Sequence, residues 1–435
     1  MNSTSFMQRN NTTVISLIKK PSVLVLIFIS AITCSSWAQT RLIWGRQYGT
    51  DQEEYARNHV ADKSGNLYIA GNTRGVMQDK NAGKTDGFLT KIDSSGNAEW
   101  SRQFGSEGDE DVQWSAIDTK GNVYIVGSTT GAVGEKKYGK EDIFLVKYSP
   151  EGKKIWVKQF GCDSTDIAQG IFVDTKGFIY LTGATMGVLG KSGSGSQDAF
   201  IMKLDNNGVP VFVQQFGTPA PDMCSAVTGD NMGNIYVAGS TFGELGSVSK
   251  GFMDGFTGQF TENGSLVKFT QFGSEGFDIT TSIILDNEKN IYIGGSTSGN
   301  LSGEQKGEGD CFVLKFNPGS ELMWKDQFGT EKHDGVKGLY FNDAISENIL
   351  VSGVQNLPPA HAFIRMYKKD GTMLWEKSII QQGDNRDASG KSVSMDNNGY
   401  IYHLGLTSSG LFGELIGVDD FYLVKLKAEN TFLSR

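Results

Sequence analysis

Short apolar runs separated by tight turns extend over almost the whole chain. In one unit, residues 122–127 alternate large and small side chains, and residues 142–147 and 155–160 form two further runs. A shorter run opens each unit, as in residues 166–174 of the next one. β-Branched and aromatic runs of this length, bounded by Gly, Asn and Asp, are typical of antiparallel strands joined by hairpins. No window shows sustained helical periodicity, so the pattern predicts an all-β chain.

One triplet, Gln-aromatic-Gly, recurs along the chain at a spacing of 56 residues. The six clear copies begin at Gln47, Gln103, Gln159, Gln215, Gln271 and Gln327, and a degraded seventh lies near 378–380. A repeat of this length with four strands is typical of a propeller blade rather than of a helical solenoid. The chain is therefore predicted to be a seven-bladed β-propeller of four-stranded antiparallel blades.

The two ends of the repeat region predict how the ring closes. Residues 41–47 match the fourth strand of a unit, whereas the last unit stops after residues 421–425, which match the third. We expect the N-terminal strand to complete the last blade, because this pairing leaves no free sheet edge. Residues 39–435 then form a single propeller domain.

Residues 1–38 have the pattern of a secretory signal peptide. Lys19 and Lys20 precede an apolar run at 23–29, and Ser36-Trp37-Ala38 is a small-x-small cleavage site. The pattern predicts export by the general secretory route to the periplasm, cell surface or exterior, with no transmembrane segment after cleavage. A membrane anchor formed by the same run and lipidation of Cys34 are the alternatives.

Charge and cysteine content narrow the possible partners. The formal net charge is −9, and an acidic surface argues against nucleic acid or anionic lipid as a partner. The mature chain has three cysteines, Cys162, Cys224 and Cys311, none with CxxC spacing. An odd number without that spacing predicts single buried thiols rather than disulfides or a zinc site.

Two aromatic columns recur once per unit, and we expect both to fill the wedge between blades rather than to stack on a ligand. The tyrosine column is Tyr68, Tyr124, Tyr180, Tyr236, Tyr292 and Tyr402, with Leu350 in the sixth copy. The phenylalanine column is Phe88, Phe144, Phe200, Phe256, Phe312, Phe363 and Phe421.

The composite pattern resembles the bacterial SBBP repeat, a seven-bladed propeller family. Each unit reads D-x-x-G-N-x-Y-x-x-G-x-T, then D-x-F-x-x-K, then G-x-x-x-W-x-x-Q-F-G, and the resemblance covers essentially the whole mature chain. The sixth copy, with Asn348-Ile349-Leu350 and His361-Ala362-Phe363, departs most. The resemblance implies an exported or surface protein with a binding or scaffolding role and no defined ligand.

The longer, Gly-rich loops lie on one face, which we call the loop face and expect to be the recognition surface. An acidic column opens each blade there, and we expect it to ring the mouth of the central channel: Glu54, Glu110, Asp166, Asp222, Asp278 and Asp334, with Asp387 near the seventh copy. These carboxylates either form a Ca²⁺ site or accept N–H bonds from their own loops, and the repetition favours the second interpretation.

Two further acidic columns are interpreted as structural. One leads into the first tight turn of each blade: Asp62, Asp118, Asp174, Asp230, Asp286 and Asp396. The other opens the third strand: Asp86, Asp142, Asp198, Asp254, Asp310 and Asp419. Because Asp accepts hydrogen bonds from nearby backbone N–H groups, both columns are predicted to cap turns and loops.

No catalytic or cofactor-binding residues are predicted. His59, His333, His361 and His403 occupy unrelated repeat positions, and phosphate-loop, dinucleotide and G-x-S-x-G motifs are missing from the sequence. His333, beside Asp334 at a loop tip, is the histidine expected on the loop face.

The leading functional hypothesis is a monomeric, non-catalytic propeller that binds a protein or a surface glycan through the loop face. The alternative is a secreted polysaccharide lyase or hydrolase with its site in the funnel of that face. The turn D-x-x-G-x-x-x-W also resembles quinone-dependent dehydrogenase propellers, but those have eight blades and their cofactor ligands are not found here.

Overall fold

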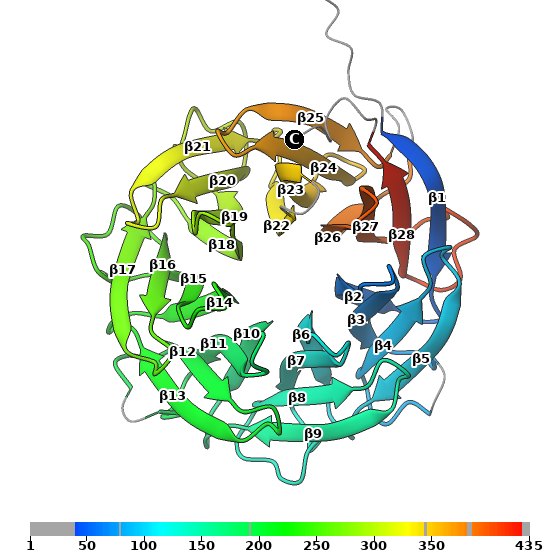
Figure 1. Cartoon of the computed structure of the whole chain (residues 1–435), viewed down its shortest axis with the longest axis horizontal. Coiled ribbons are helices and arrows are strands. Elements are labelled where there is room, and N and C mark those ends of the chain that lie inside the picture. The colour runs from blue at the N-terminus through cyan, green and yellow to red at the C-terminus, as the bar shows by residue number, and fades with distance from the viewer. Residues whose placement is uncertain (1–39, 78–79, 191–192, 343–345, 381–384, 429–435) are drawn as a thin grey trace, which may run out of the picture. The chain divides into compact units, whose positions relative to one another are not determined.

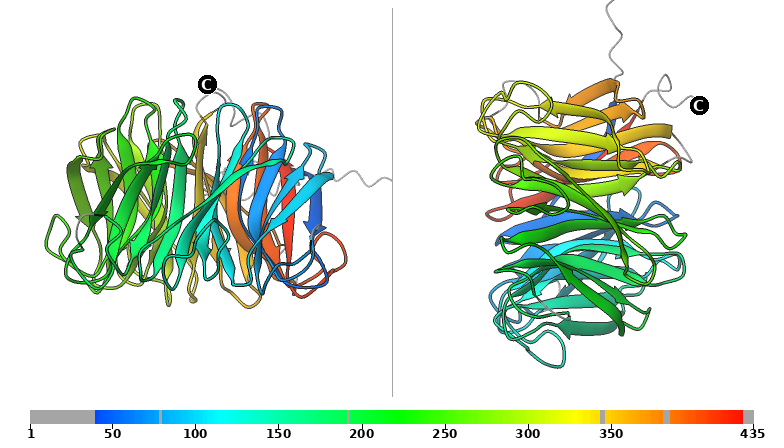
Figure 2. Two further views of the ribbon diagram at one scale, coloured as in Figure 1. Left: turned by 90° about the horizontal axis from the view of Figure 1, so that it is seen from below. Right: turned by 90° about the vertical axis from the view of Figure 1, so that its left-hand side faces the viewer.

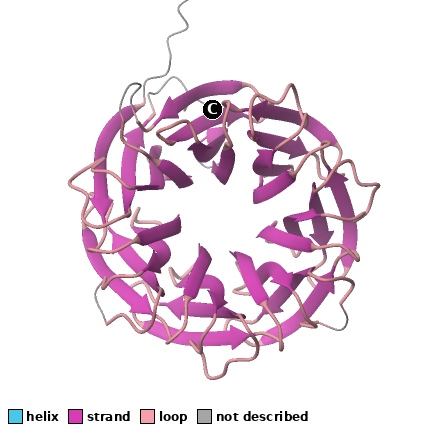
Figure 3. Cartoon of the chain, turned by 180° about the vertical axis from the view of Figure 1, so that it is seen from behind, coloured by secondary structure: helices cyan, strands magenta, loops and turns pink. Residues whose placement is uncertain are grey.

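The computed structural model describes residues 40–428, apart from 78–79, 191–192, 343–345 and 381–384. The predicted signal peptide, residues 1–38, lies outside the described residues, as does Cys34. In the described part of the chain the regular secondary structure is β-strand throughout (Figure 3), and no helix there is long and apolar enough to cross a membrane. The all-β prediction is confirmed.

The strands form seven four-stranded antiparallel sheets, each one blade. Blade 1 is β2 (Glu54–Ala61), β3 (Leu67–Thr73), β4 (Asp86–Ile92) and β5 (Ala98–Phe104). Blade 2 is β6 (Glu110–Ile117), β7 (Val123–Thr129), β8 (Asp142–Tyr148) and β9 (Lys154–Phe160). Blade 3 is β10 (Asp166–Val173), β11 (Ile179–Thr185), β12 (Asp198–Leu204) and β13 (Pro210–Phe216). Blade 4 is β14 (Asp222–Gly229), β15 (Ile235–Thr241), β16 (Asp254–Phe260) and β17 (Leu266–Phe272).

Blade 5 is β18 (Asp278–Leu285), β19 (Ile291–Thr297), β20 (Asp310–Phe316) and β21 (Leu322–Phe328). Blade 6 is β22 (Gly335–Asn342), β23 (Ser346–Gln355), β24 (His361–Lys368) and β25 (Met373–Ser378). Blade 7 combines β26 (Ser389–Met395), β27 (Tyr400–Thr407) and β28 (Asp420–Lys427) with the N-terminal strand β1 (Arg41–Tyr48). Figure 1 shows the blades around one axis with the first strand of each innermost, and Figure 2 shows loops at both ends of the blades.

Strand β1 closes the ring as the sequence predicts. It pairs antiparallel with β28 from Arg41 opposite Lys427 to Tyr48 opposite Phe421. In Figure 1 the blue β1 lies beside the red β28. The Tyr48 ring stacks on Phe421 at a centroid distance of 5.2 Å, and its hydroxyl donates to the Gly96 carbonyl of blade 1 at 2.7 Å. One strand therefore completes the last blade and also contacts the first.

The core lies between neighbouring blades. The tyrosine column is at most 3% exposed, Leu350 is 1% exposed, and the phenylalanine column is at most 1% exposed. One apolar cluster, for example, joins Tyr68 and Leu89 of blade 1 to Val112 and Phe144 of blade 2. The prediction that both columns are core is confirmed.

Each first strand carries a β-bulge, at its fourth residue in β2, β6, β10, β14 and β18 and at its third residue in β22 and β26. A bulge adds one residue to a strand and turns it out of the ladder. Because the first strands are innermost (Figure 1), these half-buried residues belong to the strands that surround the ring axis. We call them the bulge residues: Arg57, Gln113, Gln169, Ser225, Thr281, Lys337 and Lys391.

Removal of residues 39–49 should destabilise the whole ring, because blade 7 loses its fourth strand and exposes an unpaired edge. The expected drop in melting temperature is roughly 10 °C, since each lost kcal/mol lowers it by about 2 °C in a chain of this size. Scanning calorimetry and size-exclusion chromatography provide the measurement. A synthetic peptide of residues 39–49 should restore stability in trans. An unchanged melting temperature in a monomeric truncated protein would contradict closure by β1.

Candidate functional site

The acidic column that opens each blade is buried beneath the loop face. Glu54, Glu110, Asp166, Asp222, Asp278 and Asp334 are at most 1% exposed. These carboxylates therefore do not present an exposed acidic ring to solvent at the channel mouth. Side chains alternate between the two faces of a strand. In blades 1 to 5 the first residue of the first strand is directed toward the protein interior, where its carboxylate is buried.

Each of these carboxylates accepts hydrogen bonds from its own loop. Glu110 accepts the Ser106 N–H at 2.8 Å and the Ser106 hydroxyl at 2.5 Å, and the Thr129 hydroxyl donates to it at 2.7 Å. The N–H groups of Thr50, Cys162, Thr218, Ser274 and Thr330 bind the other five in the same way. The geometry is that of a loop cap. Burial is also the largest cause that raises the pKa of Glu54, Glu110, Asp222, Asp278 and Asp334.

The repeated glutamine fastens the long loop between the second and third strands. Gln103 donates through Nε2 to the Asp86 carboxylate at 2.9 Å and to the Gly75 carbonyl at 3.1 Å, while its Oε1 accepts the Met77 N–H at 2.9 Å. Each of the other clear copies of the triplet bonds its own aspartate: Gln47, Gln159, Gln215, Gln271 and Gln327.

The glycine of the triplet makes room for two carboxylates. A Cβ at Gly105 would lie 2.2 Å from Oδ1 of Asp86 and 2.7 Å from Oε2 of Glu110. The same crowding is found at Gly49, whose neighbours are Asp420 and Glu54. We call this arrangement of glutamine, glycine and two carboxylates the junction network. It explains why a Gln-aromatic-Gly triplet marks every regular blade.

Two register positions in the seventh blade differ from the prediction by one residue. Asp420, not Asp419, opens β28 opposite Thr407 and accepts Gln47 at 2.7 Å. Ala388, not Asp387, occupies the position of the first acidic column, because its N–H bonds the preceding blade as Glu110 does. Asp387 instead accepts the Ser408 hydroxyl at 2.8 Å.

The junction between blades 6 and 7 has lost the whole network at once. Ser378 lies where the glutamine would be, opposite Phe363, and His361 takes the aspartate position opposite Gln355. Ile380 and Ala388 replace the glycine and the second carboxylate, and both are buried in an apolar cluster. Because these replacements occur together, the network behaves as one unit.

His333 and Asp334 do not form a surface pair. His333 is exposed on the loop face, whereas Asp334 is 0% exposed and accepts the Asn356 N–H at 2.9 Å. Two other histidines are buried within the ring of blades. His59 is 6% exposed and bonds Ser392 and Ser394, and His403 is 0% exposed. Burial lowers the pKa of His59 to about 4.

In the described part of the chain, no three His, Cys, Asp or Glu side chains gather as a metal-binding group. The three cysteines are free; Cys224 and Cys311 are buried, and half-buried Cys162 caps Asp166 through its N–H.

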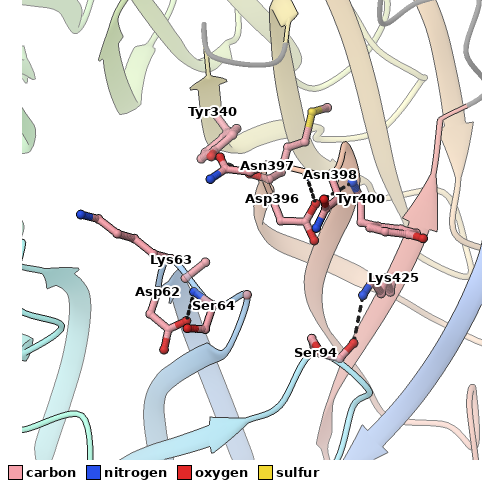
Figure 4. A pocket seen from close by; sticks show the side chains of 13 residues that line it. Asp62, Lys63, Ser64, Ser94, Tyr340, Asp396, Asn397, Asn398, Tyr400 and Lys425 are labelled. Atoms are coloured by element: carbon pink, nitrogen blue, oxygen red, sulfur yellow. Dashed lines mark hydrogen bonds between the residues drawn. The ribbon is translucent and has the colours of Figure 1, made fainter.

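Two pockets lie on the opposite face, among the tight turns. One, of about 310 Å³, lies between blades 7 and 1 (Figure 4) and is lined by Asp62, Tyr340, Asp396 and Lys425 among others. The other, of about 350 Å³, is lined by the same turn and by Asp118. Several of their polar groups already have partners: Asp62 accepts the Ser64 N–H at 2.9 Å, and Lys425 donates to the Ser94 carbonyl at 3.0 Å. We therefore interpret these pockets as gaps between the tight turns that recur in each blade, and not as ligand sites.

The loop face carries one aromatic patch, which sequence analysis missed. Phe242, Phe252 and Phe277 are 39%, 69% and 43% exposed. The rings of Phe252 and Phe277 stack at a centroid distance of 5.5 Å, and Phe242 meets Phe277 edge-on at 6.4 Å. We call these three residues the phenylalanine patch. Phe242 and Phe252 belong to the loop between β15 and β16, and Phe277 belongs to the loop between β17 and β18, so the patch joins two loops that are separate in the sequence.

The patch breaks the repeat symmetry and is held firmly. In blade 2 the residue equivalent to Phe277 is Asp109. The Phe277 N–H donates to the Ser298 hydroxyl at 2.8 Å, and the Phe252 N–H donates to the Gly276 carbonyl at 3.1 Å. Exposed apolar rings on a rigid backbone are typical of an interaction surface.

The fold and its junctions define this chain as a seven-bladed β-propeller built from repeats. A family model described as the SBBP beta-propeller repeat matches residues 99–135, 155–190 and 267–302. The chain therefore carries SBBP-type repeats within a seven-bladed propeller.

The Caulobacter vibrioides protein named regulatory protein FlaEY is 23% identical over 323 residues. That match covers 64% of this chain and 34% of the relative, so the chain spans about a third of the curated relative's length. Among solved structures, the β-propeller domain of the Trilobed protease from Pyrococcus furiosus is 10% identical, with a TM-score of 0.49 and coverage of 88% and 98% of the two chains. A gluconolactonase from Xanthomonas campestris is 10% identical, with a TM-score of 0.39 and coverage of 89% and 91%. At these identities the solved structures carry no functional information for this chain.

Asp166→Asn should lower the free energy of unfolding by about 1–2 kcal/mol, because the amide cannot accept all the donors that the carboxylate accepts. Asp163→Asn is the matched control in the same loop, where the exposed side chain should contribute less than about 0.5 kcal/mol. Urea unfolding with and without Ca²⁺ is the measurement, and we expect no calcium dependence. A calcium-dependent stabilisation that is lost in an Asp166→Asn/Asp222→Asn/Asp278→Asn variant would contradict the capping role.

Proposed function

We propose that the chain is an exported, non-catalytic binding module that recognises a protein partner through the loop face, with the phenylalanine patch at the centre of the contact. The observation that carries this proposal is the exposure of three aromatic rings, with Phe277 packed against the other two, at one blade junction of a face built largely by repetition. The export component rests on the signal pattern of residues 1–38.

The composition of the patch favours a protein over a glycan. Sugar recognition combines a flat ring with hydrogen-bonding groups directed at hydroxyls, whereas the three phenylalanine rings carry no polar atom. Aromatic side chains that are exposed in the free protein and can be desolvated together are typical of protein–protein hot spots. The backbone bonds at Phe252 and Phe277 hold the patch in place, so binding costs little conformational entropy.

The Caulobacter relative is named a regulatory protein, which is in keeping with a binding role. The alternative of a polysaccharide lyase or hydrolase requires accessible acid and base groups. The paired carboxylates of the junction network are at most 1% exposed and recur in several blades, which favours a structural role for them. No particular observation favours the enzyme.

The test begins with identification of the partner by photo-crosslinking. A crosslinking amino acid replaces Phe252 in one exported protein and Met232, which is 76% exposed on the opposite face, in another. A protein crosslinked from position 252 and not from position 232 is then purified for affinity measurement.

Phe252→Ser and Phe277→Ser should each weaken binding of that purified partner about tenfold, because loss of a hot-spot ring costs about 1.4 kcal/mol or more. Met232→Ser, the matched control, should bind like the parent protein. Unchanged affinity in both phenylalanine variants would contradict the proposal. Binding to a glycan array that depends on Phe252 would replace the protein by a glycan as the ligand.

A further inference from the structure

The bulge residues differ in charge from one part of the ring to the other. Blades 2 to 5 place uncharged side chains there, namely Gln113, Gln169, Ser225 and Thr281. Blades 6, 7 and 1 instead place Lys337, Lys391 and Arg57. These three blades are consecutive around the ring (Figure 1), so three cations lie side by side at one level of the axis. We call them the axial cations.

The axial cations are close enough to affect one another. Burial is the largest cause that lowers the pKa of Lys391, to about 8, and Lys337 and Arg57 lower it further. Burial also lowers the pKa of Lys337, and Arg57 adds to that effect. Both lysines are half-buried at equivalent bulge positions of adjacent blades, beside like charges. Such an arrangement destabilises the folded protein unless an anion offsets it.

The described residues supply one counter-charge. Asp111 is 2.7 Å from Nη2 of Arg57, and it also accepts the side-chain amides of Asn72 at 2.9 Å and Gln113 at 2.6 Å. Nε of Arg57 is buried and has no hydrogen-bond partner. A guanidinium has five N–H donors, so Arg57 can donate to a ligand as well as to Asp111. Among the described residues, neither Lys337 nor Lys391 has an ion pair. Three positive charges and one negative charge leave the group with a charge of +2.

We propose that Arg57, Lys337 and Lys391 bind a small oxyanion with two negative charges, of the sulfate or phosphate type, on the ring axis. The anion balances the group's charge, and the unpartnered guanidinium and ammonium donors supply its hydrogen bonds. The fold does not require cations at this position, because glutamine occupies it in blades 2 and 3. The site is separate from the phenylalanine patch, so failure of either proposal leaves the other unaffected.

The test variant replaces both lysines by glutamine, the residue that other blades of this chain have at the same position. Lys337→Gln/Lys391→Gln places in blades 6 and 7 the residue that blades 2 and 3 already hold, so the ring should fold. The control is Lys154→Gln, which removes an exposed lysine of β9. The probes are sodium sulfate and inorganic phosphate at low millimolar concentration, with sodium chloride added to constant ionic strength.

In the parent protein, sulfate and phosphate should each raise the melting temperature by about 3 °C or more, and calorimetric titration should show one site per chain. The double variant should bind at least about tenfold more weakly and lose this increase. Its melting temperature without added anion should be higher than that of the parent, because like-charge repulsion is removed. Lys154→Gln should behave like the parent throughout.

Two results would overturn the proposal. One is the absence of a sulfate or phosphate response in the parent protein. The other is a response that the double variant retains, which would show a general salt effect or a site elsewhere. A double variant that is destabilised without anion yet still binds sulfate would likewise assign the lysines a purely structural role.

Discussion

The junction network is the interaction on which the loop face depends. At each regular junction, a buried carboxylate caps the loop between blades, and a second one, with its glutamine, fastens the long loop within the blade. Burying a carboxylate is costly unless donors surround it, so each loop must supply those donors in one geometry. The loops are long and rich in glycine, yet their backbone is held at several points. A surface that would otherwise be mobile becomes a fixed platform.

The blade 6–7 junction shows how strongly the parts of this network are coupled. Glutamine, glycine and both carboxylates are replaced there together, and Ile380 and Ala388 fill the space with apolar contacts. A partial replacement would leave a buried charge without its donors, which costs more than removing the set. β1 pairs with β28 as the outermost strand of blade 7, and its Gln47 together with Gly49 belongs to the network between blades 7 and 1.

The fold was predictable because the same strand and turn pattern occurs in every copy of the repeat, so each copy supports the assignment of the others. A 56-residue period, four strand-like runs and complementary ends determine seven blades and the closing strand. The aromatic columns were predictable for the same reason. The direction of individual side chains was not predictable from the sequence. Glu110 and Asp334 were placed correctly at the start of a blade, but their carboxylates are buried. In the seventh copy, whose spacing departs from the period, Asp387 and Asp419 were each displaced by one residue from the register positions held by Ala388 and Asp420. The phenylalanine patch joins two loops and the axial cations come from three strands, and a linear pattern does not connect these segments.

Rigidity of the loop face is the central claim, and hydrogen–deuterium exchange of the intact protein tests it directly. The loop amides bound by the network, such as those of Met77, Ser106, Leu245 and Ser274, should exchange as slowly as the core strands. The amide of Lys63, in a tight turn of the opposite face, should exchange faster because it has no hydrogen-bond acceptor among the described residues. Exchange of the four loop amides at the rate of an unprotected chain would contradict the account.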